Sequence, residues 1–131
     1  MSSTRIPFGR GPSGWRAHTH VARVLHYIET NYSNHTCNVP GASRELRLSA
    51  PYVTRLLKRH TGLGFVAHLR RRRIAAAHTL MQTTHLSIKE IAGAIGYGCP
   101  RKFERDVKLL HGVTPSMLRR RASRVPDLAA S

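Results

Sequence analysis

Two arginines, Arg55 and Arg105, stand at matching places in two stretches of the chain that resemble each other. The guanidinium group of arginine carries a planar fork of N–H donors, and this fork fits the O6 and N7 acceptors of guanine in the DNA major groove. Thr54 and Lys58 lie near Arg55, and Arg101, Lys102 and Lys108 lie near Arg105. Hydroxyl and basic groups donate hydrogen bonds to base edges and phosphates. The residue types therefore indicate recognition of a polyanion.

Except for Arg70, which lies on the predicted linker helix at residues 64–82, the candidate contacts lie on the outward faces of two predicted helices, at residues 49–60 and 100–111. The candidates for base contacts are Pro51, Tyr52, Thr54, Arg55, Arg101, Lys102 and Arg105. The candidates for phosphate contacts are Ser49, Lys58, Arg59, Arg70 and Lys108. A plainer interpretation stays open for each, because exposed basic residues are usually just solvated and Pro51 also suits the first turn of a helix.

Residues 87–95 predict the first helix of a helix-turn-helix unit. Apolar residues recur there at the helical spacing that gives one buried face: Ile88, Ile91, Ala92 and Ile95. Ser87 and Glu90 match a capping box at the start of this helix, and Gly96 suits the left-handed conformation that ends a helix.

Residues 100–111 predict the second helix of this unit. Pro100 suits its first turn, where a missing N–H costs little. The predicted inward stripe is Phe103, Val107 and Leu110, and the outward residues are Arg101, Lys102, Glu104, Arg105 and Lys108. A helix, a turn with glycine and a second helix with a basic outward face form the arrangement that reads the DNA major groove.

The same pattern occurs earlier in the chain. A shift of 49 residues carries Val39, Ala42, Ser43 and Leu46 onto the apolar face of residues 88–95, and a shift of 50 carries Val53, Arg55, Leu57 and Gly62 onto Phe103, Arg105, Val107 and Gly112. An internal repeat of this kind predicts two helix-turn-helix units, one on either side of a linker helix.

The predicted fold is all-α, with two helix-turn-helix subdomains joined by a long linker helix and about seven helices. The first subdomain takes residues 20–63, the linker 64–82 and the second subdomain 83–121, between a flexible basic tail at 1–19 and a flexible tail at 122–131. The linker would span on the order of 28 Å, close to the roughly 34 Å between successive major grooves on one face of DNA.

Composition favours a nucleic-acid partner. The chain has 22 Lys plus Arg against 6 Asp plus Glu, for a formal net charge of +16, and strong basicity attracts polyanions. No apolar run resembles a membrane span or a signal peptide, so we expect a cytoplasmic protein at the nucleoid with no membrane partner. No group of residues has the spacing of a metal or catalytic site, so we expect no metal, no cofactor and no enzyme activity.

The sequence resembles the DNA-binding domain of the AraC/XylS family of bacterial transcription activators over roughly residues 20–121. The similarity is carried by IKEIAGAIGY at residues 88–97, Phe103, GVTP at residues 112–115, and Arg73 with Ala77 on the linker. The resemblance implies a short, stand-alone member that binds double-stranded DNA as a monomer and recruits RNA polymerase. Two unlike reading helices in one chain predict an asymmetric DNA site. The resemblance also implies a structural role for Arg73, in which its side chain pairs with a carboxylate or with backbone carbonyls.

A non-specific nucleoid-associated protein is the main alternative, because a net charge of +16 attracts any DNA. Cys99 lies beside the second recognition helix, which leaves a redox-sensing role open. Both alternatives therefore stay open beside sequence-specific recognition.

We predict that the first unit is the less stable of the two. Arg47 stands where the turn of the family usually has glycine, and a left-handed conformation there costs roughly 1–2 kcal/mol. Gly41 inside a helix costs about 1 kcal/mol more relative to alanine. Native-state hydrogen exchange should therefore give weaker protection in residues 39–60 than in residues 87–111. Equal or stronger protection of the first unit would contradict this prediction.

Overall fold

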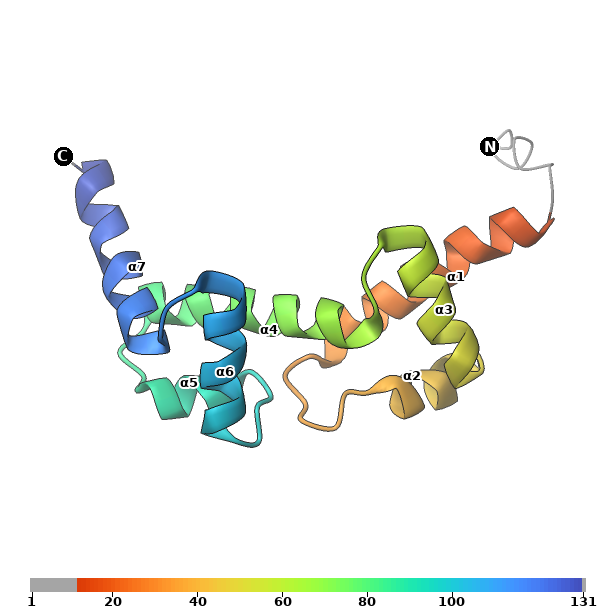
Figure 1. Ribbon diagram of the computed structural model, residues 1–131, viewed down its shortest axis with the longest axis horizontal. Coiled ribbons are helices and arrows are strands. Elements are labelled where there is room, and N and C mark those ends of the chain that lie inside the picture. The colour runs from red at the N-terminus through yellow and green to blue at the C-terminus, as the bar shows by residue number, and fades with distance from the viewer. Residues whose placement is uncertain (1–11, 131) are drawn as a thin grey trace. The chain divides into compact units, whose positions relative to one another are not determined.

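The computed structural model describes the backbone of residues 12–130 and the side chains of residues 17–122. Within these residues the chain forms seven α-helices and no strand, which confirms the predicted all-α class (Figure 1). The helices are α1 (Pro12–Asn31), α2 (Val39–Leu46), α3 (Ala50–Thr61), α4 (Phe65–Thr83), α5 (Ile88–Ala94), α6 (Pro100–His111) and α7 (Pro115–Ala130). None of the described helices combines the length and the apolar character that crossing a membrane requires.

The chain divides into two compact units. The first comprises Met1–Thr30 and Asn38–His68, and the second comprises Asn31–Cys37 and Leu69–Ser131. Each unit contains one pair of short helices, α2 with α3 in the first and α5 with α6 in the second, while α4 has residues in both. The two helix pairs thus occur where the internal repeat predicts them.

Both ends of the chain contain more helix than the sequence predicts. α1 begins at Pro12 rather than near residue 20, and proline is favoured at the first position of a helix. α7 continues to Ala130, through the segment for which the sequence predicts an unstructured tail. The part of the predicted N-terminal tail at residues 1–11 lies outside the described residues.

In the first unit, side-chain caps set the starts of α2 and α3. Asn38 precedes α2, and its Oδ1 accepts a hydrogen bond from the backbone N–H of Gly41 at 2.8 Å. Ser49 precedes α3, and its Oγ accepts from the backbone N–H of Tyr52 at 3.2 Å. Each cap satisfies a donor that a helix start leaves free, which contributes about 1 kcal/mol. The two caps therefore fix the residues at which α2 and α3 begin.

The turn between α2 and α3 contains the backbone strain that the sequence predicts. Arg47 has φ 59° and ψ 43°, and it is the one described non-glycine residue with a positive φ. The equivalent residue of the second unit, 49 positions later, is Gly96, with φ 101°. The second unit therefore has a residue without a Cβ at the position where the first has an arginine.

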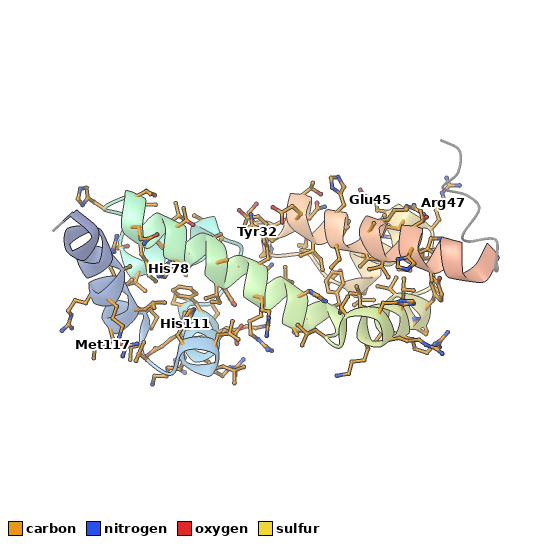
Figure 2. The ribbon with its side chains drawn as sticks, turned by 90° about the horizontal axis from the view of Figure 1, so that it is seen from above. Tyr32, Glu45, Arg47, His78, His111 and Met117 are labelled. Atoms are coloured by element: carbon orange, nitrogen blue, oxygen red, sulfur yellow. The ribbon has the colours of Figure 1, made fainter. Side chains whose placement is uncertain are left out.

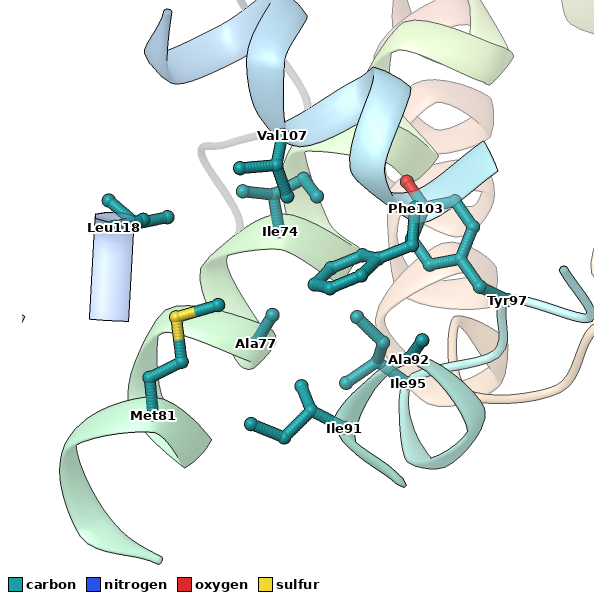
Figure 3. Packing of buried hydrophobic residues seen from close by; sticks show 10 residues of the cluster. All are labelled: Ile74, Ala77, Met81, Ile91, Ala92, Ile95, Tyr97, Phe103, Val107 and Leu118. Carbon is teal, nitrogen blue, oxygen red and sulfur yellow. The ribbon is translucent and has the colours of Figure 1, made fainter. Parts of the chain in front are cut away.

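The second unit has an apolar core formed by residues from α4 to α7 (Figure 3). Its buried members are Ile74, Ala77, Met81, Ile91, Ala92, Ile95, Tyr97, Phe103, Val107 and Leu118. Phe103 and Val107 are fully buried, as the predicted inward stripe of α6 requires. The prediction for Leu110 was wrong, since 36% of this residue is exposed. Asp106 takes the third buried position on α6 instead.

The capping box predicted at the start of α5 is confirmed. Ser87 Oγ accepts from the backbone N–H of Glu90 at 3.0 Å, and Glu90 Oε1 accepts from the backbone N–H of Ser87 at 2.8 Å. The two bonds satisfy two free donors at once, which fixes the start of this helix.

Arg73 is buried in the second unit, with 7% of its surface exposed. Its Nε donates to the carbonyl oxygen of Tyr32 at 2.8 Å, and its Nη2 donates to the carbonyl oxygen of Asn34 at 2.9 Å. The guanidinium also lies 5.3 Å from the centre of the Tyr97 ring. The predicted structural role of Arg73 is thus confirmed, with backbone carbonyls as its hydrogen-bond partners.

Replacement of Gly96 by alanine should strongly destabilise the second unit. An added Cβ would collide with the carbonyl oxygen of Tyr32 and would lie 3.0 Å from Nε and Nη2 of Arg73. Because strain at φ 101° adds to this collision, we expect Gly96→Ala to lower the unfolding free energy by at least about 2 kcal/mol in urea titrations followed by circular dichroism.

Gly93→Ala is the matched control for this substitution. Gly93 lies within α5, and an added Cβ there meets no atom within 4 Å. Alanine should therefore stabilise this helix by about 0.5–1 kcal/mol. Similar effects of the two substitutions would contradict the close approach at Gly96.

Candidate nucleic-acid interface

Helix α3 has one apolar face and one polar face. Its buried residues are Val53, Leu56 and Leu57. The opposite face carries predicted contact residues at helical spacing, all of them exposed: Pro51, Thr54, Arg55 and Lys58. Arg59 beside them is exposed as well, and no acidic residue occurs in this helix. The outward face of α3 is therefore positively charged and rich in hydrogen-bond donors.

Two of the predicted contact residues in this unit also bond to the protein itself. Tyr52 is half-buried, its hydroxyl lies 2.8 Å from Nδ1 of His20, and the two rings meet edge to face with centres 5.4 Å apart. Ser49 uses its hydroxyl oxygen to cap α3 and keeps its O–H as a donor. A base contact by Tyr52 would have to replace or share its bond to His20, whereas Ser49 remains able to donate to a phosphate.

Helix α6 has the same division into faces. Phe103, Asp106 and Val107 are buried. The exposed residues at helical spacing on the other side are Arg101, Glu104, Arg105 and Lys108, and Lys102 is exposed at the flank. Arg105 thus occupies in α6 the exposed place that Arg55 occupies in α3. The equivalence predicted from the repeat holds in the structure.

A buried polar cluster, made of Arg70, Tyr97 and Asp106, ties α6 to α4 in the second unit. The hydroxyl of Tyr97 donates to Oδ2 of Asp106 at 2.7 Å. Nε of Arg70 lies 3.7 Å from Oδ1 of the same carboxylate, which is an ion-pair distance but too long for a hydrogen bond. This buried Nε has no hydrogen-bond partner among the described residues. The phosphate contact predicted for Arg70 therefore competes with an ion pair inside the protein.

The internal repeat contains a sequence signal for this cluster. The shift of 50 residues aligns Asp106 with Leu56, a core residue of α3, and a carboxylate in a core position requires a buried donor. The hydroxyl of Tyr97 is that donor. Burial, and secondly the hydrogen bond to Asp106, raise the pKa of the phenol. The phenol therefore stays protonated at neutral pH and can donate.

The N-terminal end of α6 is electropositive. Cys99 caps this helix and is exposed. The nearby backbone N–H groups of Lys102 and Arg101 lower the pKa of its thiol, helped by the charges of Arg101 and Arg105. In contrast, burial raises the pKa of the Cys37 thiol. The amides and charges that favour a thiolate at Cys99 equally favour a phosphate or an acceptor on a base at this end of the helix.

Histidines occur in two ring pairs. His78 of α4 and His111 of α6 stack with ring centres 6.3 Å apart (Figure 2). In the first unit the rings of His18 and His60 lie 6.0 Å apart. In the described part of the chain, no three or more His, Cys, Asp or Glu residues gather in a way that could hold a metal ion. Each histidine pair joins the end of a recognition helix to a neighbouring helix.

Similarity to known proteins extends over most of the chain. A protein-family sequence model, described as a helix-turn-helix domain, matches residues 42–121, which include α3 and α6. Over 105 residues the chain is 40% identical to the HTH-type transcriptional regulator GlxA of Rhizobium meliloti. The aligned part covers 80% of this chain and 32% of GlxA, so the chain spans about a third of the length of that relative.

Two solved structures have the same fold. The C-terminal domain of AraT, a response regulator from Geobacillus stearothermophilus, matches with a TM-score of 0.74 and 31% identity over 76% of this chain and 83% of that chain. A probable AraC family transcriptional regulator from Rhodopseudomonas palustris matches with a TM-score of 0.68 and 25% identity over 78% of this chain and 95% of that chain. With the two exposed recognition faces, these matches show that the chain belongs to the AraC/XylS family of DNA-binding transcription regulators.

Proposed function

We propose that the chain binds double-stranded DNA in a sequence-specific manner, with α3 and α6 each lying in a major groove. The observation that carries this proposal is the pair of matched, exposed faces that place Arg55 and Arg105 at equivalent positions. An arginine that donates to both O6 and N7 of guanine contributes about 1–3 kcal/mol of discrimination. The proposed base contacts are completed by Pro51, Tyr52, Thr54, Arg101 and Lys102.

Phosphate contacts hold each recognition helix in its groove in this proposal. Lys58 and Arg59 would serve α3 and Lys108 would serve α6, since all three are exposed beside the reading faces. Ser49 and Arg70 are the further candidates, and a phosphate contact by Arg70 would compete with its ion pair to Asp106. Such contacts set the register of the protein on the duplex and make its affinity dependent on salt.

The two reading faces differ in chemistry, so we expect an asymmetric DNA site. By the 50-residue repeat, α3 has Pro51 and Thr54 where α6 has Arg101 and Glu104. Dimeric helix-turn-helix proteins need palindromic sites because their two-fold symmetry repeats one reading helix. One chain with two unlike reading helices needs no second copy, and we therefore propose that it binds as a monomer.

The length of α4 suits reading in successive grooves. Its 19 residues correspond to a rise on the order of 28 Å. Successive major grooves on one face of DNA are about 34 Å apart. Two recognition helices held closer than one helical turn would require the DNA to bend, and the site would then depend on bases that no side chain touches.

Membership of the AraC/XylS family supports transcription activation as the outcome of binding. In this proposal the chain acts at the bacterial nucleoid and recruits RNA polymerase to a promoter beside its site. RNA polymerase would be recruited only where the chain has bound its DNA site, so the base contacts of the chain would determine which genes respond.

A second candidate function is non-specific coating of the nucleoid. The formal net charge of +16 favours it, since this charge attracts DNA of any sequence. Non-specific binding typically has dissociation constants near 10⁻⁴–10⁻⁶ M, while specific sites are commonly bound several orders of magnitude more tightly. The ratio of the two affinities at one salt concentration separates the candidates.

Selection of bound duplexes from a random library at about 150 mM salt tests the proposed function. We expect an asymmetric motif with two blocks whose centres lie about one helical turn apart. Arg55→Ala should erase the preference within one block and Arg105→Ala the preference within the other, because each removes one guanine-reading fork. Arg44→Ala is the matched control, since Arg44 is an exposed arginine on α2, outside both recognition helices.

The control should keep both blocks and weaken binding to all sequences alike. Circular dichroism melts should agree among the four proteins, because all three arginines are exposed. A library without any enriched motif would contradict sequence-specific reading and favour nucleoid coating. A single block would contradict the reading of sequence by both helices.

A further inference from the structure

Glu104 is an acid within the otherwise basic reading face of α6. Phe103 and Val107 point into the core (Figure 3), which leaves Glu104 exposed on the face that it shares with Arg101, Arg105 and Lys108. A carboxylate in this position repels the phosphates of any DNA that α6 approaches. Its presence there therefore opposes binding unless it makes a compensating contact.

The structure gives Glu104 no role inside the protein. Glu90 closes a capping box, and Asp106 accepts a hydrogen bond from Tyr97. The side chain of Glu104, in contrast, makes no hydrogen bond or ion pair with any described residue. Lys108 lies four residues further on, where an intrahelical ion pair is geometrically allowed, but the two side chains are not paired in the structure. The carboxylate is thus free to meet a ligand.

We propose, building on the DNA reading proposed above, that Glu104 determines specificity by accepting a hydrogen bond from the N4 amino group of a cytosine. An ionised carboxylate can only accept, and cytosine presents an amino donor to the major groove. Guanine and thymine present acceptors there, which repel a carboxylate. Adenine has an amino donor but also an N7 acceptor beside it, so cytosine is the base that fits best.

This contact separates the two reading helices in chemistry. The residue of α3 equivalent to Glu104 is the neutral, exposed Thr54, which can donate or accept. Only α6 would therefore combine arginine forks that require guanine with a carboxylate that requires an amino group. Repulsion from phosphates and from the wrong bases lowers the affinity for other sequences, which raises specificity without tightening the best complex.

The test measures binding of the whole chain to a duplex selected by the wild type, and to every single-base substitution of that duplex, by fluorescence anisotropy. The proteins are the wild type, Glu104→Ala, Glu104→Gln and the matched control Glu45→Gln. Glu45 is an exposed acid on α2, so its substitution makes the same change of charge outside the recognition helices. Thermal melts of all four proteins establish that the fold is retained.

We expect the wild type to prefer cytosine at one position of the α6 block by about 10-fold or more over guanine and thymine. Glu104→Ala should abolish this preference, and Glu104→Gln should move it toward adenine, whose N6 and N7 match a carboxamide. Glu45→Gln should leave it unchanged.

An unchanged base preference in both Glu104 variants would overturn the inference, including the case in which they bind all duplexes more tightly, as Glu45→Gln would by charge alone. In that result the proposed function still stands, because the wild type still discriminates among duplexes. Failure of the wild type to discriminate at any position would instead contradict the proposed function itself.

Discussion

The buried guanidinium of Arg73 is the contact on which the arrangement of the second unit depends. It donates to the carbonyl oxygens of Tyr32 and Asn34 and lies against the ring of Tyr97. Tyr97 in turn donates to Asp106 of α6. These contacts form one connected series from the segment before α2, through α4 and the turn after α5, to the second recognition helix. Removal of Arg73 would take this donor from the carbonyl oxygen of Tyr32, while the carbonyl oxygen of Asn34 would keep the hydrogen bond from the backbone N–H of Cys37 at 3.0 Å.

The two units share a plan and differ in how they hold their recognition helices. In the first, Leu56 fills the core position at which the second has Asp106, and Tyr52 bonds to His20 from the exposed side of α3. The second gains an oriented hydrogen bond and an ion-pair partner for Arg70. Because hydrogen bonds are directional, such a contact restricts the rotation of a recognition helix about its own axis. Each recognition helix is thus held by a directional hydrogen bond in addition to its apolar packing.

Much of this could be predicted from the sequence, because apolar spacing, caps and the internal repeat are local signals. They correctly gave the all-α class, the exposed faces of α3 and α6 and the capping box at Ser87. They also marked Arg47 as a strained position should its backbone be left-handed, which it is. The partners of Arg70, Tyr52 and Asp106 are residues distant in the chain, and no local pattern specifies them. Leu110 was misjudged because helical spacing gives the direction of a side chain, while exposure depends on what other elements cover it.

We propose that two helices of one chain, α3 and α6, read bases in two major grooves. Guanine methylation interference tests it most directly, since the methyl group at N7 lies in the major groove, where an arginine fork would donate. On the duplex selected by the wild type, the account predicts interference at guanines in two clusters about 10 base pairs apart. Guanines that all tolerate methylation, or interference confined to one cluster, would contradict it.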